Sequence, residues 1–344
     1  MRVLIVRLGA FGDIIHTLPL AADLHRAGHQ IGWVCEDRWA CVLRHNPVID
    51  RVHELPRKAL RDATKGFAHR WLLLRRLLRD VRSGGYDVVI DAQGLGKSAI
   101  IAGWSGSKNR IGHAPPRSRE VSWLVSRTRV RPQAVHVIDQ QRALGLPLLG
   151  IGARGGWQFP LPTWDAERVF ARSWLISQHI ATEPSQGAVM LNVGAGWPTK
   201  VWPQTCQIAF ARLCQERKLP LVLVWGSPAE RTMAETIVQE AKYGIMAPPT
   251  SIPQLAGILS FARVLVSGDT GPLHLCTALG RPAVGLFGPV PAARNGPRGR
   301  GYRTLQAPGA AWERKDVSKV NMGALSAESV LNAAVAASMD EHSV

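Results

Sequence analysis

The sequence predicts an α/β protein with two domains, each built around a doubly wound parallel sheet. Short apolar, β-branched runs alternate with amphipathic segments through both halves of the chain, and this alternation is typical of strand–helix–strand units. The 344 residues exceed one ordinary domain and are enough to bury two cores. Hydrophobic residues make up 46% of the chain, yet none of their runs approaches the roughly 20 residues that a membrane-spanning helix needs.

The first half of the chain opens on an apolar run too short for a signal peptide, so we expect a β-strand there and a cytoplasmic protein. The elements expected in this half are a strand at 2–7, a loop to residue 13, a helix at 14–27, a strand at 30–35, a basic helical stretch at 57–82, a strand at 87–91 and a helical patch from residue 97.

The second half repeats the alternation after a passage rich in proline and glycine at residues 146–162. The elements expected there are helices at 165–179, 204–217, 229–242, 252–260, 272–280 and 326–338, and strands at 188–192, 221–224, 244–246, from 264 on, and 283–287. The predicted organisation is an N-terminal domain at 1–160, a linker with a bridging helix at 161–186, a C-terminal domain at 187–325 and a last helix within 326–344. Whether that helix packs back on the first domain stays open.

Positive charge is concentrated in the first half. Residues 1–160 hold 25 Lys and Arg against 12 Asp and Glu, which accounts for +13 of the formal net charge of +17. Nine of these cations fall within residues 57–82, where apolar residues recur at spacings of three and four, so we expect a helix with a basic face, broken near Gly66. Such a face is either merely solvated or binds an anion: a nucleic acid, an anionic membrane or an acidic substrate.

The loop between the first strand and the first helix, Gly9–Asp13, lacks the G-x-G-x-x-G spacing of a dinucleotide site, so no nicotinamide or flavin cofactor is expected. Asp13 has two interpretations. It is the N-cap of the following helix, or a carboxylate at the sheet edge that accepts a proton from a substrate hydroxyl. The five cysteines show no C-x-x-C spacing and no D-x-D motif occurs, so neither a disulfide framework nor a metal site is predicted.

Three strand-to-helix loops of the second half have the features of a phosphate site. The small residues Gly194 and Gly196 permit close approach of a ligand to the backbone, and Lys200 supplies a charge suited to phosphate. Glu230 follows the next strand, where it either binds ribose hydroxyls or favours the helix dipole. In the third loop Asp269, Thr270 and Gly271 begin a helix whose first free N–H groups suit an anion, and His274 lies in its first turn. Each of these residues also has a purely structural interpretation.

These residues form a recognisable series. The segments Asp269–His274, Ala278–Pro282 and Leu286–Pro289 resemble the nucleotide-sugar signature of the bacterial lipopolysaccharide heptosyltransferases of glycosyltransferase family 9, most closely the heptosyltransferase I group. The resemblance covers most of the chain in the family's order, and its further segments are Gly9–Asp13, Asp91–Ser98, Arg119–Glu120, Lys200–Pro203 and Trp225–Glu230. One departure is that Ala195 and Gly196 stand where family members offer hydroxyl side chains.

The resemblance implies a glycosyltransferase B fold, with two Rossmann-like domains facing across a cleft. It implies transfer of L-glycero-D-manno-heptose from ADP-heptose to a Kdo residue of the lipid A inner core, with inversion and without a metal or cofactor. By similarity Asp13 is the catalytic base. The donor residues it implies are Gly194, Gly196, Lys200, Glu230, Asp269, Thr270, Gly271 and His274, and the acceptor residues expected are Gly12, Arg61, Arg75, Arg76, Gln93 and Arg119.

We further expect a monomer that contacts the anionic inner leaflet of the inner membrane through the basic segment 57–82, and no nucleic-acid partner. Two alternatives fit the residues. The same scaffold would transfer a second heptose, or use another nucleotide-sugar and acceptor. Outside the enzymes, a basic two-domain protein would bind nucleic acid, although none of the standard motifs occurs here.

Overall fold

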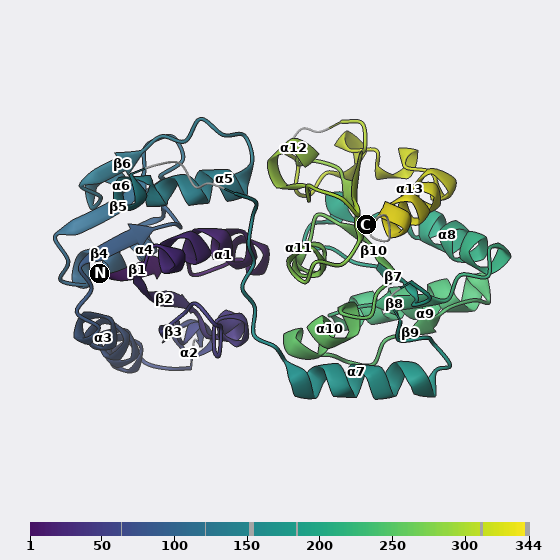
Figure 1. Cartoon of the computed structure of the whole chain (residues 1–344), viewed down its shortest axis with the longest axis horizontal. Helices are drawn as coiled ribbons and strands as arrows, with labels where there is room; N and C mark the ends of the chain where they lie inside the picture. The colour runs from purple at the N-terminus through teal and green to yellow at the C-terminus, as the bar shows by residue number, and fades with distance from the viewer. Residues whose placement is uncertain (63, 121, 151–154, 184, 310–311, 341–344) are drawn as a thin grey trace. The chain divides into compact units, whose positions relative to one another are not determined.

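The computed structural model describes residues 1–62, 64–120, 122–150, 155–183, 185–309 and 312–340. The chain divides into two compact units, Met1–Pro162 and Thr163–Val344. Each unit contains one six-stranded sheet with helices on both faces (Figure 1). Every strand pair in both sheets is parallel, which confirms the predicted α/β class.

The sheet of the first unit has the strand order β3-β2-β1-β4-β5-β6. Its strands are β1 (Arg2–Val6), β2 (Gln30–Glu36), β3 (Arg51–Leu55), β4 (Val88–Asp91), β5 (Asn109–His113) and β6 (Thr128–Val130). Its helices are α1 (Phe11–Arg26), α2 (Arg57–Arg61), α3 (Phe67–Ser83), α4 (Gly96–Trp104), α5 (Val137–Arg142) and α6 (Leu146–Leu149). Helices α1 and α5 pack together, while α3 packs on β3 and α4 on β4.

The central strand explains why this sheet is covered on both faces. Residues Val3 to Val6 of β1 are fully buried, so both faces of the pleat are apolar and each must be covered by helices. Leu4 and Val6 belong to the core under α3 and α4, which Leu77, Leu78 and Val81 complete.

The sheet of the second unit has the order β12-β11-β10-β7-β8-β9. Its strands are β7 (Val189–Asn192), β8 (Leu221–Val224), β9 (Ile245–Met246), β10 (Val264–Gly268), β11 (Ala283–Phe287) and β12 (Tyr302–Gln306). Its helices are α7 (Asp165–Ser177), α8 (Gln204–Glu216), α9 (Pro228–Ala241), α10 (Ile252–Leu259), α11 (Gly271–Ala278), α12 (Ala292–Asn295) and α13 (Ala327–Asp340).

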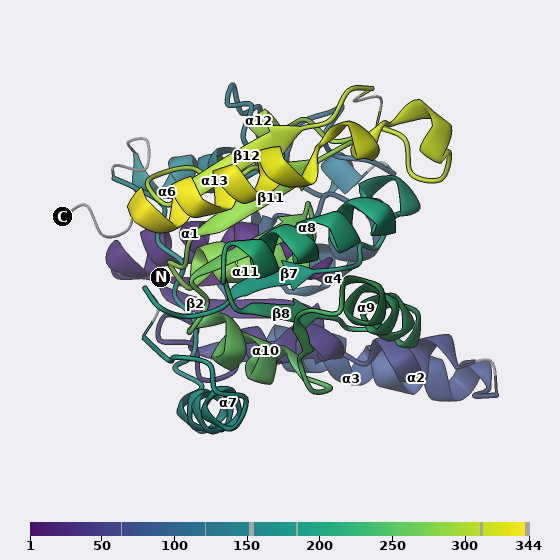
Figure 2. The same cartoon turned by 90° about the vertical axis from the view of Figure 1, so that its right-hand side faces the viewer.

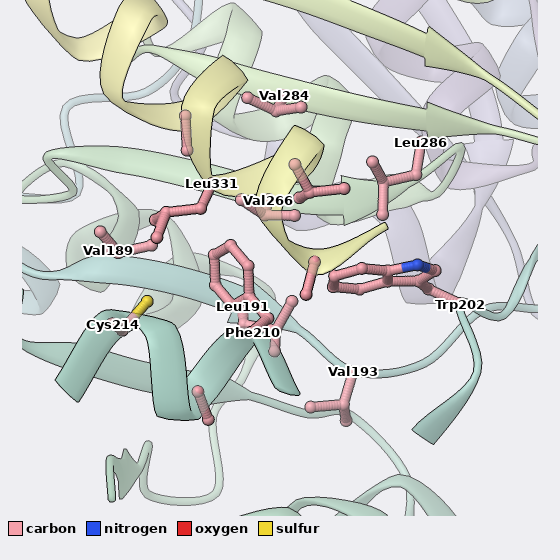
Figure 3. Packing of buried hydrophobic residues seen from close by; sticks show 14 of the residues in the cluster. Val189, Leu191, Val193, Trp202, Phe210, Cys214, Val266, Val284, Leu286 and Leu331 are labelled. Carbon is pink, nitrogen blue, oxygen red and sulfur yellow. The ribbon is translucent and has the colours of Figure 1, made fainter. Parts of the chain in front are cut away.

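A core of the second unit lies between this sheet and α8, α9 and α13. Leu191, Val266 and Leu286 from three strands meet Phe210 of α8 and Leu331 of α13 there (Figure 3). The indole N–H of Trp202 donates to the Leu325 carbonyl at 2.9 Å, so the segment that leads into α13 is fixed to the segment that leads into α8.

The last helix and α7 both pack on elements of the second unit. Helix α13 packs against α8 and strands β10, β11 and β12 of the second unit (Figure 2). Helix α7 lies inside the segment expected as a bridge, but it packs on α10 and belongs to the second unit.

Four strands have no counterpart in the sequence prediction: β3, β5, β6 and β12. Three of them, β3, β6 and β12, are at sheet edges, where one side of the strand lacks a neighbour and polar residues are tolerated. Strand β12 reads Y-R-T-L-Q and is only half-buried, so it contains no continuous apolar run. The break predicted near Gly66 is present, since Gly66 is the N-cap of α3.

Candidate functional site

The candidate donor residues lie at the carboxyl ends of three adjacent strands, β8, β7 and β10. The loops that follow these strands therefore meet at one edge of the sheet, the usual ligand position in doubly wound folds. Lys200 ends the short 3₁₀ turn Pro198–Lys200 after β7, Glu230 lies in the first turn of α9 after β8, and Asp269 follows β10.

Asp269 is the centre of a buried polar network. Lys200 Nζ lies 2.6 Å from Asp269 Oδ2 and also donates to the Asp269 carbonyl at 3.0 Å. His274 Nε2 is 3.1 Å from Asp269 Oδ1, and the Asn295 amide donates to Asp269 Oδ2 at 3.3 Å. The network brings together residues far apart in sequence and leaves little of the Lys200 and Asp269 side chains exposed, 13% and 3%.

The network keeps Asp269 charged. Burial by itself favours the neutral acid, but the hydrogen bond with His274 and the charge of Lys200 outweigh it, so the pKa of Asp269 lies well below its ordinary value. The Lys200 ammonium is therefore paired in this structure, and an arriving phosphate must share it with Asp269.

Thr270 and Gly271 begin helix α11. Thr270 is the N-cap residue by its backbone, and its hydroxyl lies 3.0 Å from the Ser267 hydroxyl and 3.2 Å from the Asn192 amide nitrogen. This hydrogen bonding orients the start of the helix. The first N–H groups of α11 have no partner within the helix, a feature that suits an anion at the same edge.

Glu230 fits against a glycine of the neighbouring loop. Its Oε2 accepts the Gly226 N–H at 2.7 Å, and a Cβ placed on Gly194 would lie 2.1 Å from its Oε1. Only glycine at 194 leaves room for this carboxylate. A Cβ on Gly196, in contrast, would meet nothing within 4 Å, so that position faces open space.

In the first unit Asp13 lies in the first turn of α1, which begins three residues earlier than the sequence predicts. Ala10 is therefore the N-cap, and the interpretation of Asp13 as N-cap is wrong. Asp13 Oδ2 accepts the Ala10 N–H at 3.1 Å and lies 2.6 Å from an Arg7 nitrogen. The Asp13 side chain is 39% exposed whereas Arg7 is buried, so the carboxylate is held from one side and accessible from the other.

Gln93 fixes the loop before Asp13. Its Oε1 accepts the Leu8 N–H at 3.1 Å and the Gly9 N–H at 3.4 Å. Asp91, at the end of β4, accepts the N–H groups of Gln93 and Gly94, and burial raises the pKa of its carboxyl. Gly12 lies in the first turn of α1 beside Asp13.

Sequence reasoning missed a cluster of cations next to this loop. The Glu36 carboxylate, almost fully buried, pairs with Arg38 at 2.8 Å, Arg57 at 3.1 Å and Lys97 at 3.6 Å. A Cβ on Gly9 would lie 3.7 Å from Glu36 Oε2, so the cluster borders the Asp13 loop. Three cations from three separate segments pair with one carboxylate here, so the cluster carries surplus positive charge.

The other four predicted acceptor residues, all arginines, are exposed and lie on α2, on α3 and in a loop. Arg61 lies on α2, and Arg75 and Arg76 lie on α3, all with exposed side chains. Arg119 is exposed, and its backbone N–H donates to the Gly94 carbonyl at 2.9 Å. None of these four has a contact with Asp13 among the residues described.

Comparison with known proteins decides the family. The family model of glycosyltransferase family 9 (heptosyltransferase) matches residues 74–322. The chain belongs to glycosyltransferase family 9. It is thus a glycosyltransferase, as the resemblance implied.

Individual members of the family are similar over nearly the whole chain. Lipopolysaccharide heptosyltransferase 1 of Pseudomonas aeruginosa is 32% identical over 87% of this chain and 82% of its own length. Lipopolysaccharide heptosyltransferase 1 of Escherichia coli K12 is 28% identical over 90% and 94%. The structure of E. coli heptosyltransferase WaaC with ADP-2-deoxy-2-fluoro heptose matches with a TM-score of 0.75 at 25% identity, covering 96% and 98% of the two chains.

The fold is shared more widely. A glycosyltransferase family 9 structure from Veillonella parvula has a TM-score of 0.81 at 20% identity and covers 98% of this chain and 97% of its own. These family 9 structures confirm the predicted glycosyltransferase B fold.

Proposed function

We propose that this family 9 member transfers L-glycero-D-manno-heptose from ADP-heptose to a Kdo residue of the lipopolysaccharide inner core, with inversion at the anomeric carbon. The observation that carries the proposal is the Lys200–Asp269–His274 network beside the start of α11, at the edge where a phosphate would bind. Support comes from relatives named lipopolysaccharide heptosyltransferase 1 and from the WaaC structure with an ADP-heptose analogue.

The donor would bind the second unit. Lys200 and the N–H groups at Thr270 and Gly271 would receive the diphosphate and stabilise the charge that develops on ADP as it leaves. Glu230 would accept hydrogen bonds from ribose hydroxyls. Gly194 and the open position at Gly196 would permit close approach of the nucleotide, while Asp269 and His274 hold Lys200 in place.

The acceptor would bind the first unit. Asp13 would remove the proton from the attacking Kdo hydroxyl, and Arg7 and the Ala10 N–H would hold its carboxylate in position. The oxygen then attacks the anomeric carbon from the face opposite ADP, which leaves in the same displacement. Retention would instead need a second carboxylate as nucleophile, by analogy with glycosidases.

Anionic groups of the acceptor would meet cations near Asp13. Gln93 and Gly12 shape the loop, and the Arg38, Arg57 and Lys97 cluster around Glu36 offers surplus positive charge for a Kdo carboxylate. The exposed side chains of Arg61 and Arg119 would extend this basic surface.

The test is transfer from ADP-heptose to Kdo₂-lipid A by the wild type and by Asp13→Ala, with EDTA present, together with ADP-heptose binding by both. We expect turnover by the wild type and a loss of at least about a thousandfold in the variant, which still binds the donor. If the wild type binds ADP-heptose but shows no turnover, the proposed Kdo acceptor is wrong. If it does not bind ADP-heptose, the proposed donor is wrong.

We also propose that the exposed part of α2 and α3 contacts the anionic surface of the inner membrane from the cytoplasmic side. No helix among the residues described is long and apolar enough to cross a membrane. Phe67 at 80% and Trp71 at 46% exposure lie on the first turns of α3, close in sequence to Arg75, Arg76 and Arg79. Apolar residues beside cations are typical of helices that bind a lipid surface.

Replacing the three arginines together by alanine should raise the acceptor KM and weaken binding to vesicles that contain anionic lipid, while the donor Kd stays unchanged. A soluble, deacylated acceptor distinguishes binding of the acceptor's phosphates from binding of the membrane's phosphates, because it is not embedded in a membrane. An unchanged KM with lipid-linked acceptor would refute this proposal.

A further inference from the structure

A cluster of two tryptophans and three cations surrounds the turn that carries Lys200. Lys200 Nζ lies 4.6 Å from the centre of the Trp197 ring, and the guanidinium carbon of Arg314 lies 4.3 Å from the same ring. The Arg294 guanidinium carbon is 4.9 Å from the centre of the Trp312 ring. The two indoles meet edge to face, with centroids 5.8 Å apart. Each cation is thus within cation–π distance of an indole face.

Hydrogen bonds attach the segments of this cluster to the donor site. Thr199 donates its hydroxyl to the Glu313 carbonyl at 2.7 Å, which joins the Trp312–Arg314 segment to the turn before Lys200. The Glu313 carboxylate accepts the N–H groups of Arg314, Lys315 and Asp316, so the backbone at Arg314 is turned and held.

Helix α12, which carries Arg294, is attached in the same way. Asn295 donates to Asp269 Oδ2 at 3.3 Å, and Arg294 donates to the Asn295 side-chain oxygen at 2.8 Å. Hydrogen bonds thus connect both arginine-bearing segments to the turn that carries Lys200 or to its partner Asp269, although the segments lie more than 90 residues beyond Lys200 in sequence.

The charges show what these arginines add. Lys200 is paired with Asp269, so this pair contributes no surplus positive charge to the site. A nucleoside diphosphate carries several negative charges, and the helix start alone offers only partial ones. Among the residues that the structure describes, no carboxylate pairs with the Arg314 guanidinium. Surplus positive charge near Lys200 therefore comes from Arg314, whose guanidinium is stacked on Trp197.

We propose that Arg314 and Arg294, held on Trp197 and Trp312, bind the diphosphate of the donor and stabilise it as it leaves. This role rests on the proposed donor. A planar guanidinium matches phosphate oxygens in a bidentate manner, and stacking on an indole fixes its plane before the ligand arrives. The tryptophans are thus positioning residues, and the two arginines contact the phosphates in addition to Lys200 and the N–H groups at the start of α11.

The experiment is calorimetric binding of ADP, AMP and adenosine to the wild type, Arg314→Ala, Arg294→Ala and Trp197→Leu. We expect each arginine variant to weaken ADP binding about tenfold, the loss of one charge-assisted hydrogen-bonded contact, and to leave adenosine binding unchanged. The AMP loss should be smaller than the ADP loss. Trp197→Leu should also weaken ADP binding. Arg314→Lys should recover only part of the affinity that Arg314→Ala loses.

Lys315→Ala is the matched control, because it removes an equal charge from the adjacent exposed residue. We expect it to change ADP binding less than twofold. Equal losses for Lys315→Ala and Arg314→Ala would overturn the proposal, since the effect would then be a long-range field. A wild type that binds ADP together with an Arg314→Ala variant of unchanged affinity would overturn it and leave the proposed function intact. A wild type that binds no ADP would overturn the proposed donor itself.

Discussion

Replacing Lys200 by methionine should destabilise the second unit by about 3 kcal/mol, because a buried carboxylate loses its cation. Lys200 Nζ is 2.6 Å from Asp269 Oδ2, and the two side chains are only 13% and 3% exposed. Removing one partner of such a pair costs roughly 3 to 5 kcal/mol. The lower end applies here because His274 remains 3.1 Å from Asp269 and keeps part of the stabilisation.

The assay is thermal unfolding, followed by a signal specific to the second unit. For a unit of this size each kcal/mol moves Tm by about 2 to 4 °C, so the expected fall is about 6 to 12 °C. The double variant Lys200→Met/Asp269→Asn is the control, since it also removes the charge that was left buried. It should recover more than half of the loss. A fall below about 2 °C, or additive losses in the double variant, would refute the reasoning.

Three further predictions concern other contacts. Gly194→Ala should weaken ADP binding about tenfold, because its Cβ would lie 2.1 Å from Glu230 Oε1 and displace that carboxylate. In a Glu230→Ala background Gly194→Ala should reduce ADP affinity little. An equal loss of affinity in that background would contradict the steric cause. His113→Leu should make the first unit less sensitive to acid. Burial, with a smaller effect of Arg117, lowers the pKa of His113 from 6.5 to about 3, so only the unfolded state takes up this proton as pH falls below 6.5. The wild type should therefore lose about 2 kcal/mol between pH 7 and 5 that the variant keeps, as measured by urea unfolding at each pH, and parallel pH curves would exclude His113. Gly257→Ala should lower the Tm of the second unit, because its Cβ would lie 2.4 Å from the Glu167 carbonyl oxygen and push α7 away from α10, at a cost of about 1 to 3 kcal/mol. An unchanged Tm would show that the two helices separate freely.

The sequence predicted the buried strands well because their signal is local. Strand β8 matches its predicted bounds, 221–224, and β11 matches 283–287, since both are continuous apolar runs buried on two faces. The half-exposed edge strands β3 and β12 escaped because partial solvent exposure removes the need for such runs. The start of α1 was placed three residues late because no side chain of the usual capping types precedes Phe11.

The candidate donor residues were also accessible from sequence, since each lies directly after a predicted strand. Parallel strands end at one edge, so the loops at 194–200, 226–230 and 269–271 had to meet. What each side chain does there was not accessible. Lys200 and Asp269 are 69 residues apart, and their ion pair depends on the order of β7 and β10 in the sheet.

The sequence by itself determined the α/β class, the strand–helix alternation and the sheet edge at which the candidate residues lie, because these follow from local periodicity and from the geometry of parallel strands. Only the tertiary structure decided which charges become partners. Arg7 pairs with Asp13, Glu36 pairs with three cations, and the Arg314 guanidinium lies over the Trp197 ring. The physical reason is that an ion pair or a cation–π contact depends on distances of a few ångströms between segments far apart in the chain, and no local pattern encodes those distances.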